Sequence, residues 1–437
     1  MQTLHVRPRR IVLQSHATDL GGHSMRRAAL ASYIGSAIEF YDFFIYGTAA
    51  ALVFPTVFFP HLGTTTATVA SLGSFASAFL SRPVGAVFFG HLGDRVGRKR
   101  TLIVTLLIMG TSTFAVGLIP STAAIGIAAP LLLITMRLLQ GFAVGGEWAG
   151  AALMCAESAP REKRSYACMF TQLGLGTALV LTNLVFLLSH TLLGTSSAAF
   201  LQWGWRVPFL LSAVLVAVAF YIRMHVEETP TFTHADPTAR TGVPIVALFR
   251  RQPRELGLAA GAVSGMFVLS YQAATYFTTL AETKSGIEKT TIFVVGIMGG
   301  LVTVACVVLS ARLSDTYGAR PVMAAGFVAA VPWSFAVVPL IETGKPVLFG
   351  VAIVFTYAII GIVSGPLAAF VPGIFAFKYR YTGAALTNNF AGIIGGAIPP
   401  VLSPALMATF GGSAIALMMA GFSVLSLSCV LLLRRHR

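Results

Sequence analysis

Charged side chains are scarce in this chain. Only 10% of its 437 residues are Asp, Glu, Lys or Arg, whereas 56% are hydrophobic. A soluble domain is closer to one quarter charged, so this composition indicates an integral membrane protein. Acidic residues are scarcer than basic residues, with 15 Asp and Glu against 30 Lys and Arg. Most of the bases fall on one predicted side of the membrane, which favours cytoplasmic termini and argues against nucleic-acid binding.

Cysteine and histidine also lack the spacing that metal sites need. The four cysteines lie in apolar stretches without pairing, and we interpret them as small hydrophobes. None of the nine histidines pairs at ligand spacing, and no Gly-rich nucleotide loop leads into a helix. We therefore predict no metal and no bound cofactor. A membrane enzyme would need a nucleophile with its base, or a metal cluster, at membrane depth, and we predict no enzyme.

Long apolar runs dominate the rest of the chain. A helix needs about 20 apolar residues to span the hydrocarbon core. Twelve runs qualify, near residues 29–56, 67–90, 101–119, 125–150, 165–190, 205–224, 256–280, 291–313, 321–341, 346–370, 379–404 and 411–433. The predicted organisation is a cytoplasmic tail (1–28), a six-helix half (29–224), a cytoplasmic linker (225–255), a second six-helix half (256–433) and a short cytoplasmic tail (434–437).

The first 28 residues are polar and basic, with no short apolar stretch and cleavage site behind them. This pattern argues against a secretory signal and favours a disordered tail. Translation from Met25 is an alternative, which the intact mass of the natively expressed protein would test.

A short polar signature occurs twice, between the second and third runs and between the eighth and ninth. Gly90 to Arg100 reads GHLGDRVGRKR, and Ala311 to Pro321 reads ARLSDTYGARP. The repeat unit is therefore six helices. Two parallel six-helix halves are typical of carriers in which the substrate binds near the midplane, between the halves.

The first signature resembles the hallmark of the major facilitator superfamily. Further matches are IGSAIEFYDFFIYGTAAALVFPTVFFP in the first run, RLLQGFAVGGEWAGAAL in the fourth and GWRVPF in the sixth. Together they resemble the metabolite:proton symporter family, closest to its shikimate-transporter branch. The resemblance implies an all-α fold of twelve transmembrane helices, a bacterial inner membrane location, and a small-molecule substrate carried with protons. We expect a monomer in the lipid bilayer.

Four charged residues fall near the middle of the predicted spans of the first half. Such residues are costly in a bilayer and are functional candidates by default. Glu39 lies about 15 Å into the first helix, and Asp42 and Tyr46 follow on the same face. Arg137 reaches a similar depth, and Arg82 lies somewhat below it. A carboxylate that is removed from water can take up a proton near neutral pH. We predict Glu39 or Asp42 as the proton site and Arg137 as the anchor for a substrate carboxylate, with Arg82 as a second candidate. Tyr46 is a further candidate for binding the substrate. A permanent buried ion pair is the alternative.

The second half offers uncharged polar side chains instead. Together with Gln172 of the fifth helix, they are candidates for hydrogen bonds to the substrate, or alternatively for bonds between helices. The candidates are Tyr271, Gln272, Tyr276, Asn388 and Asn389. Glycine and proline in helices 10 and 11, such as Gly365, Gly392 and Gly396, indicate bending.

The two signatures predict a cytoplasmic gate. A salt-bridge cluster that closes one side in one state, and breaks in the other, suits alternating access. The predicted gating residues are Gly90, Asp94, Arg95, Gly97, Arg98, Lys99, Glu147, Glu157, Asp315, Gly318 and Arg320. The second signature has Thr316 and Ala319 at positions where Arg is common in the family that the chain resembles.

These observations favour a carrier that imports a small organic acid by proton symport. A symporter of zwitterions such as proline or betaine, an uncoupled carrier and an exporter remain alternatives within the same fold. A channel is the alternative outside it, and steady single-channel currents would distinguish the two.

Overall fold

The computed structural model describes residues 11–96, 98–145, 147–158, 163–193, 198–225 and 244–433. Within these ranges ten helices are long and apolar enough to cross a membrane, and a shorter apolar helix covers Ile103–Leu118. Together with helix α1, they correspond to the twelve predicted runs. The all-α membrane fold predicted from the sequence is confirmed.

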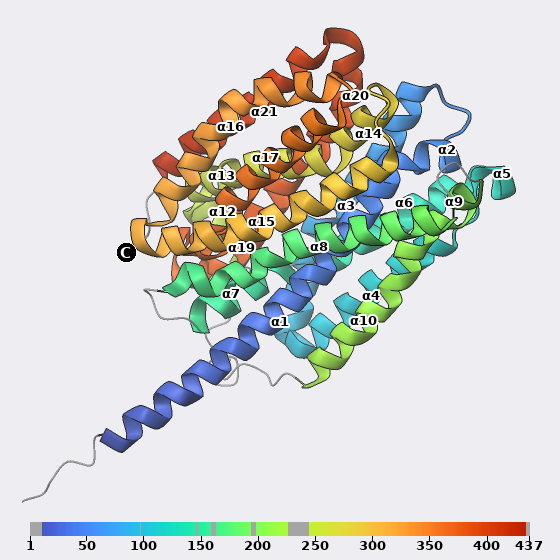
Figure 1. The fold of residues 1–437 in the computed structure, drawn as a ribbon. Helices are drawn as coiled ribbons and strands as arrows, with labels where there is room; N and C mark the ends of the chain where they lie inside the picture. The colour runs from blue at the N-terminus through green and yellow to red at the C-terminus, as the bar shows by residue number, and fades with distance from the viewer. Residues whose placement is uncertain are drawn as a thin grey trace, which may run out of the picture.

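The first half comprises six long helical segments, shown from blue to light green in Figure 1. They are α1 (Ile11–Leu52), α3 (Thr64–Val96), α4 (Arg98–Leu118), α6 (Ala128–Val144) followed by α7 (Glu147–Ser158), α8 (Arg164–Leu193) and α10 (Val207–His225). Short helices complete the connections: α2 (Phe54–Phe58), α5 (Thr122–Ile125), α9 (Ala198–Gln202) and η2 (Gly204–Arg206).

The second half, shown from yellow to red, repeats this plan. Its long segments are α13 (Pro253–Tyr271) with η4 (Gln272–Tyr276) and α14 (Phe277–Thr283), α15 (Lys289–Tyr317), α16 (Ala319–Glu342), α17 (Pro346–Ser364) with α18 (Leu367–Phe370), α19 (Arg380–Ala391) with η7 (Gly392–Ala397) and α20 (Ile398–Phe410), and α21 (Gly412–Leu432). The short helices are α12 (Pro244–Arg251), η5 (Pro372–Ile374) and η6 (Phe377–Tyr379).

Two segments differ from the sequence prediction. The structure continues α1 back to Ile11, so the prediction of a disordered tail is wrong from that residue onward. Extending an existing helix avoids the cost of nucleating a new one. Helix α12 and the start of α13 lie within the predicted linker, 225–255, whose residues 226–243 lie outside the described ranges.

The two halves meet most closely along α8 and α15, which run side by side in Figure 1. Gly176 of α8 and Gly300 of α15 face each other there. A Cβ atom added to either residue would lie 2.8 Å from the carbonyl oxygen of the other. Small residues allow helix backbones to approach closely where no hydrophobic effect drives them together. These two glycines therefore permit the contact between the halves.

Irregular turns interrupt several helices near the centre of the bundle. Segments η4 and η7 are π-helical, and η7 begins at Gly392, in the predicted bending region of helix 11. Helix α17 ends at Ser364, directly before Gly365, where the sequence predicted bending, and Pro366 follows. Such π-helical turns occur frequently at functional sites. The two π-helical turns therefore place the segments α13 to α14 and α19 to α20 among the elements that can change shape.

Candidate functional site

The four ionisable residues predicted inside the first half converge in the structure. Glu39 and Asp42 lie on α1, Arg82 lies on α3 and Arg137 lies on α6. All four are buried, and Arg137 is 0% exposed. Asp42 interacts electrostatically with both Arg137 and Glu39. We refer to these four residues as the charge cluster. Its two acids and two guanidiniums balance each other, which reduces the cost of burying them.

Phe43 lies between the two guanidiniums. The central carbon of Arg82 is 4.1 Å from the centre of the Phe43 ring, and that of Arg137 is also 4.1 Å from it. Arg137 further contacts the ring of Tyr46 at 4.3 Å. Cation–π contacts strengthen when they are removed from water. The aromatic ring therefore keeps two like charges apart and stabilises both.

Asp42 and Arg137 are connected through two residues that the sequence analysis did not select. Thr113 of α4 donates to Asp42 Oδ2 at 3.0 Å, and Gln140 Nε2 donates to Thr113 Oγ1 at 2.7 Å. Arg137 Nη1 then donates to Gln140 Oε1 at 2.9 Å. The sequence feature that could have indicated Gln140 was its place as a lone glutamine three residues after Arg137, in an apolar helix. The two charged groups are thus joined by a hydrogen-bonded chain across three helices.

Several polar atoms of this cluster are buried without a hydrogen-bond partner among the described residues. They are Asp42 Oδ1, Arg82 Nε and Arg137 Nη2. An unsatisfied buried donor next to a charged group is costly, and such atoms are uncommon in native proteins. The charge cluster therefore retains unused capacity to bind a proton or an anion.

A cavity of about 20 Å³ lies between the two halves, next to the charge cluster. We refer to it as the inner cavity. Glu39, Arg82 and Gln172 line it from the first half, and Tyr271 and Asn388 line it from the second half. Five predicted residues therefore share one cavity. The volume corresponds to roughly one water molecule, so the halves must separate before a metabolite can enter.

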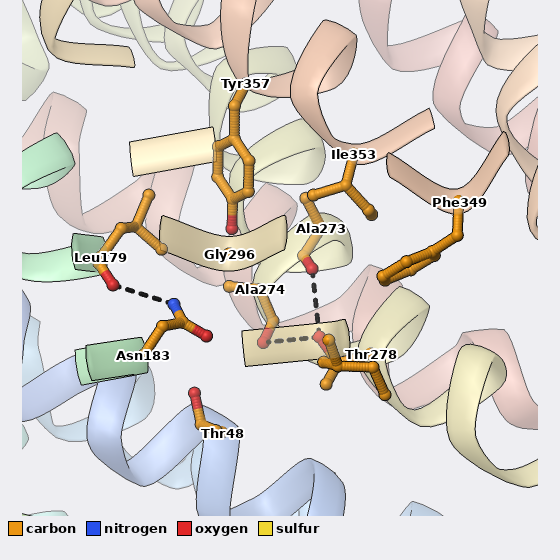
Figure 2. Close-up of a pocket in the computed structure, with 11 residues that line it drawn as sticks. Thr48, Leu179, Asn183, Ala273, Ala274, Thr278, Gly296, Phe349, Ile353 and Tyr357 are labelled. Atoms are coloured by element: carbon orange, nitrogen blue, oxygen red, sulfur yellow. Dashed lines mark hydrogen bonds between the residues drawn. The ribbon is translucent and has the colours of Figure 1, made fainter. Parts of the chain in front are cut away.

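A second cavity of about 20 Å³ lies between the halves farther along the same helices. We refer to it as the outer cavity, which Figure 2 shows. The side chains of Thr48, Asn183 and Tyr357 point toward its centre from α1, α8 and α17. Its lining contains no charged residue. The outer cavity therefore suits uncharged, hydroxyl-bearing groups.

Helix α13 and the segment η4 that follows it connect the two cavities. Ser270 and Tyr271 line the inner cavity, and Ala273 and Ala274 line the outer one. Three helical residues span about 4.5 Å, so a substrate of modest size can contact both cavities once the halves separate.

Besides Arg137, four predicted binding residues line neither cavity. Tyr46 donates to Ser74 Oγ at 3.0 Å, and Gln272 donates to Ser403 Oγ at 2.6 Å. Tyr276 is buried at the junction of η4 and α14. Asn389 donates across the halves to the carbonyl oxygen of Gly145 at 2.9 Å, directly after the end of α6. In this closed structure these residues brace helices and do not face a cavity.

One predicted gating residue joins the two halves directly. Asp315, near the end of α15, accepts hydrogen bonds from the backbone N–H groups of Ser165 at 2.9 Å and Tyr166 at 3.0 Å. These residues begin α8, so the carboxylate of one half caps a helix of the other half. Gly318 follows with a φ of 93°, a conformation that favours glycine. We call this end of the bundle the motif end.

The other predicted gating residues give less information. The side chains of Asp94, Arg95, Arg98, Lys99 and Glu157, and residue Gly97, lie outside what the structure describes, and Gly90 lies within α3. Glu147 is buried at the start of α7. Arg320 Nε and Nη2 are buried without a hydrogen-bond partner among the described residues.

The halves also touch at the opposite, far end. Thr279 donates to the carbonyl oxygen of Ala51 at 3.3 Å, and Phe186 stacks on Phe293 with ring centres 5.7 Å apart. The ammonium group of Lys289 lies 5.6 Å from the ring centre of Phe200. Both ends are therefore closed in this structure.

Comparison with known proteins agrees with this arrangement. Residues 33–400 match the Major Facilitator Superfamily. The chain belongs to this superfamily. It is 38% identical over 421 residues to the inner membrane metabolite transport protein YhjE of Escherichia coli K12. The aligned region covers 95% of each chain. It is 36% identical over 400 residues to the shikimate transporter of the same organism, which covers 89% of each chain.

A proline/betaine transporter of Salmonella typhimurium LT2 is 32% identical over 418 residues, covering 93% of this chain and 82% of the relative. The crystal structure of a D-xylose-proton symporter superimposes with a TM-score of 0.73 at 16% identity, covering 93% of this chain and 97% of the symporter. This second likeness shows the fold alone. The protein is a multi-pass membrane transporter and not an enzyme, as the sequence predicted.

Proposed function

We propose that this protein imports a small organic acid together with protons, from the far end of the bundle to the motif end. The observation on which this proposal rests is the charge cluster beside the inner cavity, with its unused hydrogen-bonding atoms. A guanidinium on the wall of a cavity between the two halves is suited to bind a carboxylate. The shikimate transporter and YhjE among its relatives support a metabolite of this class.

The geometry refines which residue meets the substrate. Arg82 and Glu39 line the inner cavity, whereas Arg137 and Asp42 do not. In this proposal Arg82 binds the carboxylate of the substrate first, and the uncharged part of the substrate extends toward Tyr357 and Thr48 in the outer cavity. Asp42, fully buried behind this layer and within electrostatic range of Arg137, takes the proton.

Alternating access then follows from the contacts that close the two ends. Binding of a proton and an anion together keeps the cluster neutral, so the loaded carrier can close around its substrate without leaving an unpaired charge in a dry site. Breaking the Asp315 cap and the contact between Asn389 and Gly145 opens the motif end. This end faces the cytoplasm in the proposed inner-membrane orientation, with both termini on that side. In this proposal the carrier works as a monomer.

A thermal-shift screen of the purified protein tests the substrate class. A ligand that binds only the folded state raises its apparent stability, by about 2.7 kcal/mol at a hundredfold excess over its dissociation constant. We expect shikimate to raise the melting temperature of the protein, and more so at acidic pH than at alkaline pH. No shift with any small carboxylate at either pH would contradict the proposal.

A second function, symport of a zwitterion, is favoured by one observation. Glu39 and Arg82 line the same cavity, and such a pair complements a molecule with one positive and one negative group. The proline/betaine relatives fit this function. The same screen separates the two, because proline or glycine betaine would then stabilise the protein and shikimate would not.

A further inference from the structure

The hydroxyl group of Thr113 lies at a branch point between Asp42 and Arg137. Its oxygen is 3.0 Å from Asp42 Oδ2 and 2.9 Å from the carbonyl oxygen of Met109, and both are acceptors. It also accepts a hydrogen bond from Gln140 Nε2 at 2.7 Å. Thr113 and Gln140 are both 0% exposed, so no bulk water competes for these bonds.

A threonine hydroxyl has one hydrogen and two lone pairs. It can therefore donate to Asp42 or to Met109, but not to both at once. Ionised Asp42 can only accept, so the hydrogen of Thr113 points toward it. Protonated Asp42 can donate, and the hydrogen of Thr113 is then free to point toward the Met109 carbonyl. Both arrangements satisfy the hydroxyl, and the charge of Asp42 decides in which direction its hydrogen points.

Among the described residues, this hydroxyl is the hydrogen-bond donor to Asp42. The charged and titratable groups that face the cluster are Glu39, Tyr41 and Tyr46 of α1, Arg137 of α6, Arg82 of α3 and Tyr271 of α13. The hydroxyl of Tyr41 donates away from the cluster, to the carbonyl oxygen of Pro208 on α10 at 3.0 Å. Arg137 reaches the chain through Gln140 Oε1.

We propose that Thr113 and Gln140 are positioning residues that transmit the protonation state of Asp42 to Arg137. This inference rests on the proposed function, because it assumes that Asp42 is the proton site. When Asp42 is ionised, the chain runs in one direction, from Arg137 through Gln140 and Thr113 to the carboxylate. When Asp42 is protonated, Thr113 accepts with one lone pair from Asp42 and with the other from Gln140, so the chain no longer ends on a negative charge that polarises its hydrogen bonds. The hold of Gln140 on Arg137 is then weaker, and the guanidinium can turn toward an anion.

The proton balance of this step is simple. One proton from the outer aqueous phase bonds to Asp42 Oδ2, which loses its negative charge. The hydroxyl of Thr113 rotates about its C–O bond and keeps its own hydrogen. No covalent bond within the protein breaks, and the same proton leaves on the opposite side when Asp42 ionises again.

Infrared difference spectroscopy tests the proposal without a substrate. The carbonyl stretch of a protonated carboxyl group is titrated with pH in the purified protein, and the Asp42→Asn variant assigns the band. Thr113→Val keeps the shape of the side chain but removes its hydroxyl. We expect the titration midpoint of the Asp42 band to move to higher pH by about one unit, the value of one hydrogen bond to a charged group. The band frequency should shift as well, because the acid loses its partner.

Two variants serve as matched controls. Thr113→Ser keeps the hydroxyl and should keep the midpoint and frequency of the wild type. Thr111→Val removes a hydroxyl of the same helix that bonds only within it, to the carbonyl oxygens of Leu107 and Ile108. It should also leave the Asp42 band unchanged. Circular dichroism of each variant verifies its helical content.

The outcomes test separately the assignment of Asp42 as the proton site and the transmission through Thr113 and Gln140, which we call the relay. A band that persists at the same midpoint and frequency in Thr113→Val would overturn the relay and leave Asp42 as the proton site. The absence of any band that Asp42→Asn removes would overturn the proton site, and the relay with it. A purely structural role for Thr113 would lower the melting temperature without moving the band, and that result also overturns the relay.

The Gln140 end of the chain has its own readout. Gln140→Leu removes the bond to Arg137 but leaves Thr113 next to Asp42. We expect the Asp42 band to persist, while the affinity for shikimate, used as the probe, loses its pH dependence. An affinity that still changes with pH as in the wild type would show that Gln140 transmits nothing.

Discussion

The contact of Asp315 with α8 makes a sharp prediction about the motif end. Replacing Asp315 by Ala removes the oxygens that accept from the backbone N–H groups of Ser165 and Tyr166. A helix cap contributes about 1 kcal/mol, and a negative charge at a helix N-terminus adds a similar amount. The total of about 2 kcal/mol corresponds to a change of roughly 30-fold in the equilibrium between closed and open states. We therefore expect Asp315→Ala to favour the state that is open at the motif end.

Distance measurements between spin labels detect this shift. Tyr317 and Arg100 are exposed positions near the motif end, one in each half, and are suitable for labels. In Asp315→Ala the population with the longer distance should rise strongly. Asp315→Asn keeps an acceptor oxygen without the charge, and it should give an intermediate population.

Thr316→Ala is the control, because its hydroxyl bonds within its own helix, to the Arg312 carbonyl. It should leave the distance distribution unchanged. Identical distributions in the wild type and in Asp315→Ala would refute the reasoning.

Three further predictions follow from the described contacts. Arg82→Lys should weaken shikimate binding at least tenfold, because a single ammonium cannot replace a fork of N–H donors; equal affinities, measured by calorimetry, would exclude Arg82 as the anchor. Tyr357→Phe should weaken the binding of a hydroxylated acid several-fold and leave that of a plain acid such as benzoate unchanged; equal losses for both would contradict the role of the outer cavity. Gly85→Ala should lower the melting temperature, since the new Cβ would lie 1.8 Å from the carbonyl oxygen of Phe142 and force α3 away from α6, whereas Gly73→Ala meets no atom within 4 Å and should not.

The sequence was sufficient to predict the fold and the charged part of the candidate site. Apolar length alone predicts the spans, because only a helix satisfies its backbone in a bilayer. Glu39, Asp42, Arg82 and Arg137 were identifiable because charges are so rare among these spans. The structure brings them together as expected, although it places Arg82 on the wall of the inner cavity and Arg137 outside its lining.

The remaining contacts of the site depend on which sides of the helices pack against each other. Thr113 is one hydroxyl among many in apolar helices, and only the packing of α4 against α1 and α6 makes it a partner of Asp42. The same holds for Asp315, whose partner is the start of a helix in the other half. Asn389 was predicted as a binding residue, but Gly145, directly after the end of α6, offers its amide a carbonyl oxygen instead. Such pairings have no periodic signal in a single sequence.

Uptake into proteoliposomes tests the central claim most directly. An imposed pH gradient, acidic outside, should drive the accumulation of labelled shikimate above equilibrium in the wild type. Asp42→Asn should abolish this accumulation while exchange of internal for external shikimate continues, because the carrier still alternates without its proton. Undiminished accumulation in both Asp42→Asn and Glu39→Gln would contradict proton coupling through the charge cluster.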